Sequence, residues 1–183
     1  MLGFFFMITG IVVLQRAVEL LIAKRNGERI KAQGGYETGA DHYKYFVGLH
    51  SLFFLGMTAE VLWRNALGRT LADWWLLPFG LFVCAQALRV WCMSALGAFW
   101  NTRIFVVPGM EPVRKGPYRY FRHPNYLVVT IELAMLPLVF QAYFTASVVT
   151  VLNALLLKKR ISVEEQALVE AVKPTMGVHH ETD

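Results

Sequence analysis

The chain has 183 residues, the size of one domain, of which 56% are apolar and only 17% are charged. A soluble domain of this size could not cover so much apolar surface, so the composition excludes an ordinary soluble protein and favours one embedded in a bilayer. The net charge of +5 does not indicate nucleic-acid binding, because the basic residues lie in loops beside apolar segments and form no recognition motif.

Three apolar stretches are each predicted to form a transmembrane helix. They cover about Gly3–Ala23, Tyr45–Trp63 and Leu71–Leu96, and each reaches roughly the 20 residues that a bilayer crossing needs. No basic segment precedes the first stretch, and Arg16 and Glu19 interrupt it. We therefore expect a retained helix there and not a cleaved signal peptide.

A fourth apolar stretch, about Leu127–Leu157, is too long for one crossing, since it would measure roughly 46 Å at 1.5 Å per residue. Pro137 and the polar Gln141 lie near its middle. It is therefore predicted to form a helical hairpin, with helices over about Asn125–Phe140 and about Tyr143–Arg160. The sequence thus predicts an all-α integral membrane protein with about five transmembrane helices.

The charges of the connecting segments support five crossings. In that topology two basic residues, Arg64 and Arg69, lie on one side of the membrane and fourteen lie on the other. The fourteen are Lys24, Arg25, Arg29, Lys31, Lys44, Arg103, Arg114, Lys115, Arg119, Arg122, Lys158, Lys159, Arg160 and Lys173. Because basic residues favour the cytoplasmic side, we expect an outside N-terminus and a cytoplasmic C-terminus, in the inner membrane if the protein is bacterial. A four-helix topology would put the last basic cluster on the wrong side.

The ionisable residues near the cytoplasmic ends of the predicted helices include Arg16, Glu19, His50 and Arg89. Such residues are costly in a membrane and usually face the bundle interior or a wet cavity. Arg16 and Glu19, three residues apart, could simply pair with each other. The sequence therefore leaves two interpretations open, internal packing or direct contact with a ligand.

The segment between the third and fourth helices is rich in turn-forming residues. Gly116-Pro117 and His123-Pro124 bias the chain away from helix and place Tyr118 and Asn125 around the start of the next helix. A helix N-terminus attracts anions, so this segment could hold a cofactor that carries a carboxylate. The alternative is that His123 only caps the fourth helix and that Arg122 contacts lipid headgroups.

Arg160 and Glu164 form a second polar pair after the last apolar stretch. They are four residues apart and therefore share one helical face. A carboxylate there could hold the ammonium of a zwitterionic amino-acid moiety, and an arginine could hold an anionic substrate. The alternative is an ordinary surface salt bridge between the two.

Taken together, these motifs resemble the isoprenylcysteine carboxyl methyltransferases and their bacterial relatives, within a wider group that includes phospholipid methyltransferases. The resemblance is most specific from Leu88 to Leu168, and the marks that carry it are Leu88-Arg89-Val90-Trp91, Leu96-Gly97, Gly116-Pro117-Tyr118, Arg122-His123-Pro124-Asn125-Tyr126 and Arg160 followed by Glu164-Glu165. The N-terminal part, with Gln15–Leu20, Lys24-Arg25-Asn26 and His42-Tyr43, is similar to a bacterial branch that methylates alkylpyrones and is associated with type III polyketide synthases.

The resemblance implies a cytoplasmic C-terminal pocket for S-adenosylmethionine (SAM) and a lipid-facing path for the substrate. Arg160 would be the catalytic, substrate-binding residue. The cofactor-binding residues would be Met110, Glu111, Pro112, Val113, Tyr118, His123, Pro124, Asn125, Tyr126 and Glu164. We expect no metal, no nucleic acid, and as partners a lipophilic small molecule, membrane lipid and a polyketide synthase that supplies the substrate.

This interpretation predicts three regions: a three-helix region over 1–96, a region over 97–173 with the cofactor loop, the hairpin and a C-terminal helix, and a disordered tail over 174–183. The expected reaction is methylation of an acidic enol or carboxylate oxygen, alkylpyrone-like in preference, which needs no strong base because such oxygens are already ionised near neutral pH. Isoprenylcysteine carboxyl methyltransferase proper, a phospholipid methyltransferase, a membrane reductase and a non-catalytic subunit are the alternatives.

Overall fold

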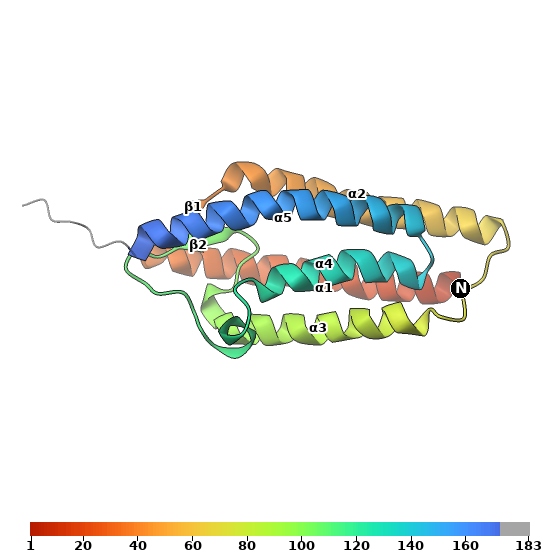
Figure 1. Ribbon diagram of the computed structural model, residues 1–183, viewed down its shortest axis with the longest axis horizontal. Coiled ribbons are helices and arrows are strands. Elements are labelled where there is room, and N and C mark those ends of the chain that lie inside the picture. Colours follow the sequence, from red (N-terminus) through yellow and green to blue (C-terminus); the bar gives the residue numbers. More distant parts are fainter. Residues whose placement is uncertain (173–183) are drawn as a thin grey trace, which may run out of the picture.

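Five helices lie side by side along one long axis in the computed structural model, which describes residues 1–172 (Figure 1). They are α1 (Leu2–Ala32), α2 (Ala40–Ala66), α3 (Leu76–Leu96), α4 (Pro124–Val139) and α5 (Tyr143–Val172). The connections contain the short strands β1 (Tyr36–Thr38) and β2 (Ile104–Val106) and the 3-10 helices η1 (Gly97–Phe99) and η2 (Gly116–Arg119). The N-terminus and the described end of α5 lie at opposite ends of the bundle.

Three of these helical segments are long and apolar enough to cross a membrane: α1, α2 and Leu76–Phe99. Large apolar side chains also cover the outside of the bundle, with Leu55, Leu77 and Phe144 exposed by 71%, 67% and 74%. Exposure of such a large apolar surface to water would be unfavourable, whereas membrane lipid would cover it. The chain is therefore an α-helical membrane protein. That α4 and α5 also cross the bilayer stays a prediction.

The structure corrects the predicted elements in two places. α5 continues through Arg160 to Val172 without a break, so the separate C-terminal helix expected there is wrong. The reason is that residues 160–172 contain no glycine or proline to end a helix. The two-stranded sheet was also not predicted, so the chain is not strictly all-α. The tail expected over 174–183 lies outside the described residues.

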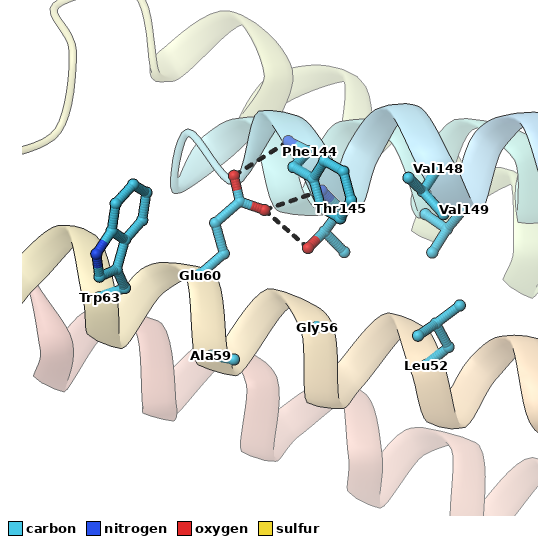
Figure 2. Close-up of a pocket in the computed structure, with 9 residues that line it drawn as sticks. All are labelled: Leu52, Gly56, Ala59, Glu60, Trp63, Phe144, Thr145, Val148 and Val149. Carbon is cyan, nitrogen blue, oxygen red and sulfur yellow. Dashed lines mark hydrogen bonds between the residues drawn. The ribbon is translucent and has the colours of Figure 1, made fainter.

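The hairpin between α4 and α5 turns where the sequence predicts. α4 ends at Val139, and Gln141 in the turn has a positive φ of 58°. The end of α2 holds this turn from the side. Arg64 donates to the Gln141 side-chain oxygen, and the Glu60 carboxylate accepts the N–H of Thr145 at 2.9 Å (Figure 2). A carboxylate at a helix N-terminus is favourable because it meets unpaired N–H groups and the positive end of the helix dipole.

The packed core occupies the end of the bundle that holds the N-terminus and the hairpin turn. Phe5 and Phe140 are fully buried there, with their ring centroids 5.0 Å apart. The rest of this core comes from Val12, Leu49, Phe53, Met57, Val61, Phe82, Leu133, Leu136, Val139, Ala142 and Val149. The opposite end is different, because polar residues and a large cavity replace this close packing.

Candidate functional site

The small sheet joins three distant parts of the chain at the open end of the bundle. β1 and β2 pair antiparallel, with Tyr36 opposite Val106, so the α1–α2 connection lies against the loop between α3 and α4. Ile104 and Val106 then pack against Ala167 on the last part of α5. The long α5 is therefore needed as the platform on which the loop that follows β2 is fixed.

A cavity of about 1440 Å³ lies between this sheet and the helices. Nine of the ten residues predicted to bind the cofactor line it, and so does Arg160. These nine are Met110, Glu111, Pro112, Val113, Tyr118, His123, Asn125, Tyr126 and Glu164. Pro124 does not line the cavity, because it is buried as the first residue of α4. As the first residue of a helix it lacks only an N–H that would be unpaired in any case, so its contribution is to fix where α4 starts.

Arg160 reaches into the cavity from α5 and is half-buried. Its Nε donates to the Tyr126 hydroxyl at 2.9 Å, and its Nη2 donates to the Thr102 carbonyl at 2.7 Å. The guanidinium also lies 4.9 Å from the ring centroid of Phe46. Among residues 1–172 no carboxylate lies within ion-pair distance of Arg160, so a surface salt bridge with Glu164 is excluded as the explanation of this pair.

His123, Tyr126 and Glu164 form one contact group at the start of α4. The His123 and Tyr126 rings stack at 5.3 Å with an angle of 14° between their planes. The Tyr126 hydroxyl donates to Glu164 Oε2, which lies 3.6 Å from His123 Nδ1. His123 occupies the residue before α4, but its side chain makes no capping hydrogen bond. Its ring instead faces Glu164 and Glu165 of α5, since Nε2 is 3.3 Å from Glu165 Oε1.

Two further residues supply hydrogen-bonding groups to this end of the cavity. The Asn125 side-chain oxygen is buried and has no hydrogen-bond partner within the described chain. Tyr118 is half-buried in η2, and burial raises the pKa of its hydroxyl above the ordinary value, with the neighbouring Cys92 adding to the rise. The Tyr118 hydroxyl therefore stays protonated at neutral pH and can act as a donor but not as a base.

The buried charges at the inner end of the cavity form a network of four. Arg16 Nη2 lies 2.8 Å from Glu132 Oε2, Arg89 also binds Glu132, and Glu19 contacts both arginines. His50 is near but separate, since its Nδ1 is 2.8 Å from the Phe46 carbonyl. The four charges sum to zero. Pairing inside the bundle is therefore confirmed for Arg16, Glu19 and Arg89, and these three and His50 also line the cavity. Direct contact of these residues with a ligand stays a prediction.

Glu132 is the main residue that the sequence interpretation missed. It is 5% exposed and contacts two helices besides its own. An acidic residue inside an apolar helix was the available signal, and it is the same signal that singled out Arg16 and Arg89. Thr102 and Phe46 were missed for another reason. They act through a backbone carbonyl and a ring face, which no motif in the sequence marks.

A second, smaller cavity of about 370 Å³ lies between α2 and α5 and is shown in Figure 2. It is lined almost entirely by apolar residues, among them Leu52, Val148 and Val149. Its carboxylate, Glu60, accepts hydrogen bonds from Phe144 N, Thr145 N and Thr145 Oγ1 at 3.1, 2.9 and 2.8 Å. With its polar group used to hold the start of α5, this cavity lacks the free polar groups that catalysis needs.

Comparison with known proteins places this site in a family. The model of the isoprenylcysteine carboxyl methyltransferase (ICMT) family matches residues 76–170, which include Arg89, the loop after β2, α4 and most of α5. The chain is 43% identical over 166 residues to the uncharacterized protein YpbQ of Bacillus subtilis, covering 91% of this chain and 97% of that protein. It is 27% identical over 154 residues to an uncharacterized protein of Haemophilus influenzae, covering 84% and 88%. No solved structure matches it.

Proposed function

Because the chain belongs to the isoprenylcysteine carboxyl methyltransferase family, and is therefore a membrane-associated methyltransferase, we propose that it uses SAM to methylate an acidic oxygen of a long-chain lipophilic substrate. The observation that carries this proposal is the joint lining of one cavity by His123, Tyr126, Glu164 and Arg160. The preferred acceptor is alkylpyrone-like, and a polyketide synthase would be the natural supplier of such a molecule.

The residues at the start of α4 fit the polar end of SAM. Glu164 is a carboxylate that can pair with the ammonium group. At the start of α4 the N–H of Asn125 can meet the carboxylate, as helix N-termini do for anions, whereas Pro124 has no N–H and the Tyr126 N–H donates to the His123 carbonyl. The buried oxygen of Asn125, without a partner in the described chain, can accept a further N–H. A volume of about 1440 Å³ exceeds the roughly 300–1,000 Å³ of a typical single-ligand pocket, which leaves room for a second molecule.

SAM, when bound, supplies a methyl group on a positively charged sulfur. That methyl carbon would pass to the acceptor oxygen, and the electron pair of the broken carbon–sulfur bond would stay on sulfur. The protein mainly aligns the two molecules, because this displacement needs an in-line approach. Arg160 holds the ionised acceptor oxygen and keeps it deprotonated, and Tyr126 fixes the guanidinium through the hydrogen bond to Nε.

In the part of the chain that the structure describes, no base lies beside Arg160, which supports an acidic acceptor. The neighbours of its guanidinium are the Tyr126 hydroxyl, the Thr102 carbonyl and the Phe46 ring. None of them removes a proton at neutral pH. A carboxylate or an enolic hydroxypyrone is already ionised there, whereas an ordinary alcohol or a phenol is not.

The test uses the purified protein in detergent. Two possible cofactors are compared, SAM and a nicotinamide cofactor, and two methyl acceptors are assayed in parallel, a long-chain alkylpyrone and a farnesylcysteine analogue. We expect calorimetry to detect SAM binding and mass spectrometry to detect a single added methyl group on the pyrone oxygen. Preference for the farnesylcysteine analogue would show that the acceptor is a prenylcysteine carboxylate and not an alkylpyrone. Binding of the nicotinamide cofactor in place of SAM would reject the methyltransferase proposal in favour of a reductase.

A further inference from the structure

The loop that carries η2 exposes an unusual combination of side chains, here called the basic–aromatic patch. Tyr120 and Phe121 are 71% and 56% exposed, although they are large aromatic residues. The cations beside them are Arg114, Lys115, Arg119 and Arg122, all exposed. No acidic residue occurs between Glu111 and Glu132 in the sequence. The patch therefore joins positive charge to unburied apolar surface within nine residues.

The position of η2 shows how deep this patch lies along the bundle. Gly116 has a φ of +55°, and a side chain there would lie 2.9 Å from both Trp91 Nε1 and Ala95 Cβ. Trp91 and Ala95 belong to the last two turns of α3, a helix long enough to cross a membrane. Only a glycine permits this approach, so the loop is fixed beside the end of α3 and not beyond it. Trp91 is itself 51% exposed, as interface aromatics are.

We propose that the basic–aromatic patch binds the anionic headgroups of the membrane leaflet that surrounds α3. Aromatic side chains favour the headgroup level of a bilayer, where their rings meet acyl chains and their edges meet water. Clustered arginine and lysine side chains attract anionic lipids, each strengthening the association by roughly fivefold near the surface. A soluble acidic partner would satisfy the charges, but it would not account for rings held at the end of a membrane-crossing helix.

This contact has a consequence for the cavity, because Arg119, Tyr120, Phe121 and Arg122 form part of its rim. Arg122 is 87% exposed and only 3.5 Å from the half-exposed Glu165, a pair that water screens. A lipid phosphate can therefore take over Arg122 without breaking a buried contact. Lipid bound at the rim stabilises the same loop that carries Tyr118. The lipid composition of the membrane therefore determines how well ordered the residues of the site are.

The test places a reporter in the patch itself and does not depend on methyl transfer. The Phe121→Trp variant is reconstituted in nanodiscs of phosphatidylcholine that contain an equal fraction of brominated phosphatidylcholine or brominated phosphatidylglycerol, and the wild-type tryptophan signal is subtracted. We expect quenching by both lipids, about twofold or more stronger with the anionic one, and we expect this preference to fade at high salt because exposed charges are screened.

Two double variants, each of which loses two positive charges, test whether the lipid preference depends on the patch. Arg119→Gln/Arg122→Gln removes two charges from the patch and should abolish the preference. Lys158→Gln/Lys159→Gln removes two exposed charges from α5 and should keep it. Equal quenching by both lipids in the unmodified background would reject anionic recognition. Unquenched fluorescence in both lipids would show that the patch faces water or a soluble partner, and would overturn the proposal entirely.

Discussion

Arg160 differs in its contacts from three other arginines that line the cavity. Arg16 and Arg89 are neutralised by buried carboxylates, and Arg103 lies 2.9 Å from Glu37 Oε1. Arg160 instead donates to a hydroxyl and a carbonyl, which orient the guanidinium without cancelling its charge. An oriented charge with no counter-ion is what stabilises a bound anion most effectively, because no reorganisation is needed when the anion arrives.

We expect Arg160→Ala to leave SAM affinity nearly unchanged and to lower kcat/KM by roughly 10²-fold or more, the scale of losing a preorganised electrostatic contact. Arg160→Lys should recover only part of the activity, since an ammonium cannot keep both hydrogen bonds of the planar guanidinium. Methyl-transfer assays on the preferred acceptor measure this. Lys159→Ala, an exposed neighbour in the same helix, is the control and should be silent. Full activity of Arg160→Ala would remove this residue from the mechanism.

His123 and Glu164 should act on the cofactor and not on the acceptor. Loss of a charge-assisted hydrogen bond predicts that His123→Ala and Glu164→Ala each weaken SAM binding by ~1–3 kcal/mol, as measured by calorimetry in detergent. Glu170→Ala removes an exposed acid of the same helix that does not line the cavity, and its affinity should match the wild type. Wild-type affinity in both site variants would contradict the proposed pocket.

The buried charge network acts at the level of whole helices, because its members come from α1, α3 and α4. Gln15 on α1 extends it, with Nε2 donating to Gln86 Oε1 of α3 at 2.9 Å. Polar bonds of this kind hold helices together in lipid, where apolar packing alone gives no preference for one neighbour over another. The network therefore fixes α1 against the family-matched part of the chain.

Removing one carboxylate from this network should be more damaging than removing a charge pair. Glu132→Gln leaves two arginines facing one glutamate, and the expected loss of stability is about 3–5 kcal/mol. Glu132→Gln/Arg89→Gln restores a neutral network and should recover part of the loss, which a double-mutant cycle of unfolding in detergent would measure. Ser94→Ala on the exposed face of α3 is the control. Strictly additive losses would show that charge balance is not the cause.

The elements differ in how far the sequence could predict them. The hairpin was predictable because an apolar stretch too long for one crossing contains Pro137 and Gln141, and the observed turn follows the end of α4 at Val139 and includes Gln141. The sheet was not, since its two three-residue strands are separated by more than sixty residues and show no alternating pattern. The site loop was located by its Gly-Pro and His-Pro steps, whereas Glu132 and Thr102 depend on tertiary contacts that no local motif records.

At the scale of the whole molecule, the distribution of the basic residues and the positions of the chain ends both support five crossings. The N-terminus and the described end of α5 lie at opposite ends of the bundle, which supports an odd number of crossings. We therefore expect reporter fusions to place the N-terminus and the α2–α3 connection outside, and the C-terminus in the cytoplasm. A fusion in the α2–α3 connection serves as the internal reference for the outer side. Reporters that place both chain ends on one side would exclude five crossings.

The length of α5 bears on the medium, membrane or water, from which each reactant would reach the site. Its 30 residues extend about 45 Å, whereas the hydrocarbon core of a bilayer is about 30 Å thick. On the five-crossing topology, about 20 residues from Tyr143 onward would cross the hydrocarbon core, so we expect Arg160 near its cytoplasmic edge and Glu164 one turn further toward the water. On the proposed function, the acceptor would therefore arrive by lateral diffusion in the membrane and the donor by diffusion through the water. Turnover should follow the mole fraction of the acceptor in the bilayer, so adding inert lipid at constant bulk acceptor should slow the enzyme.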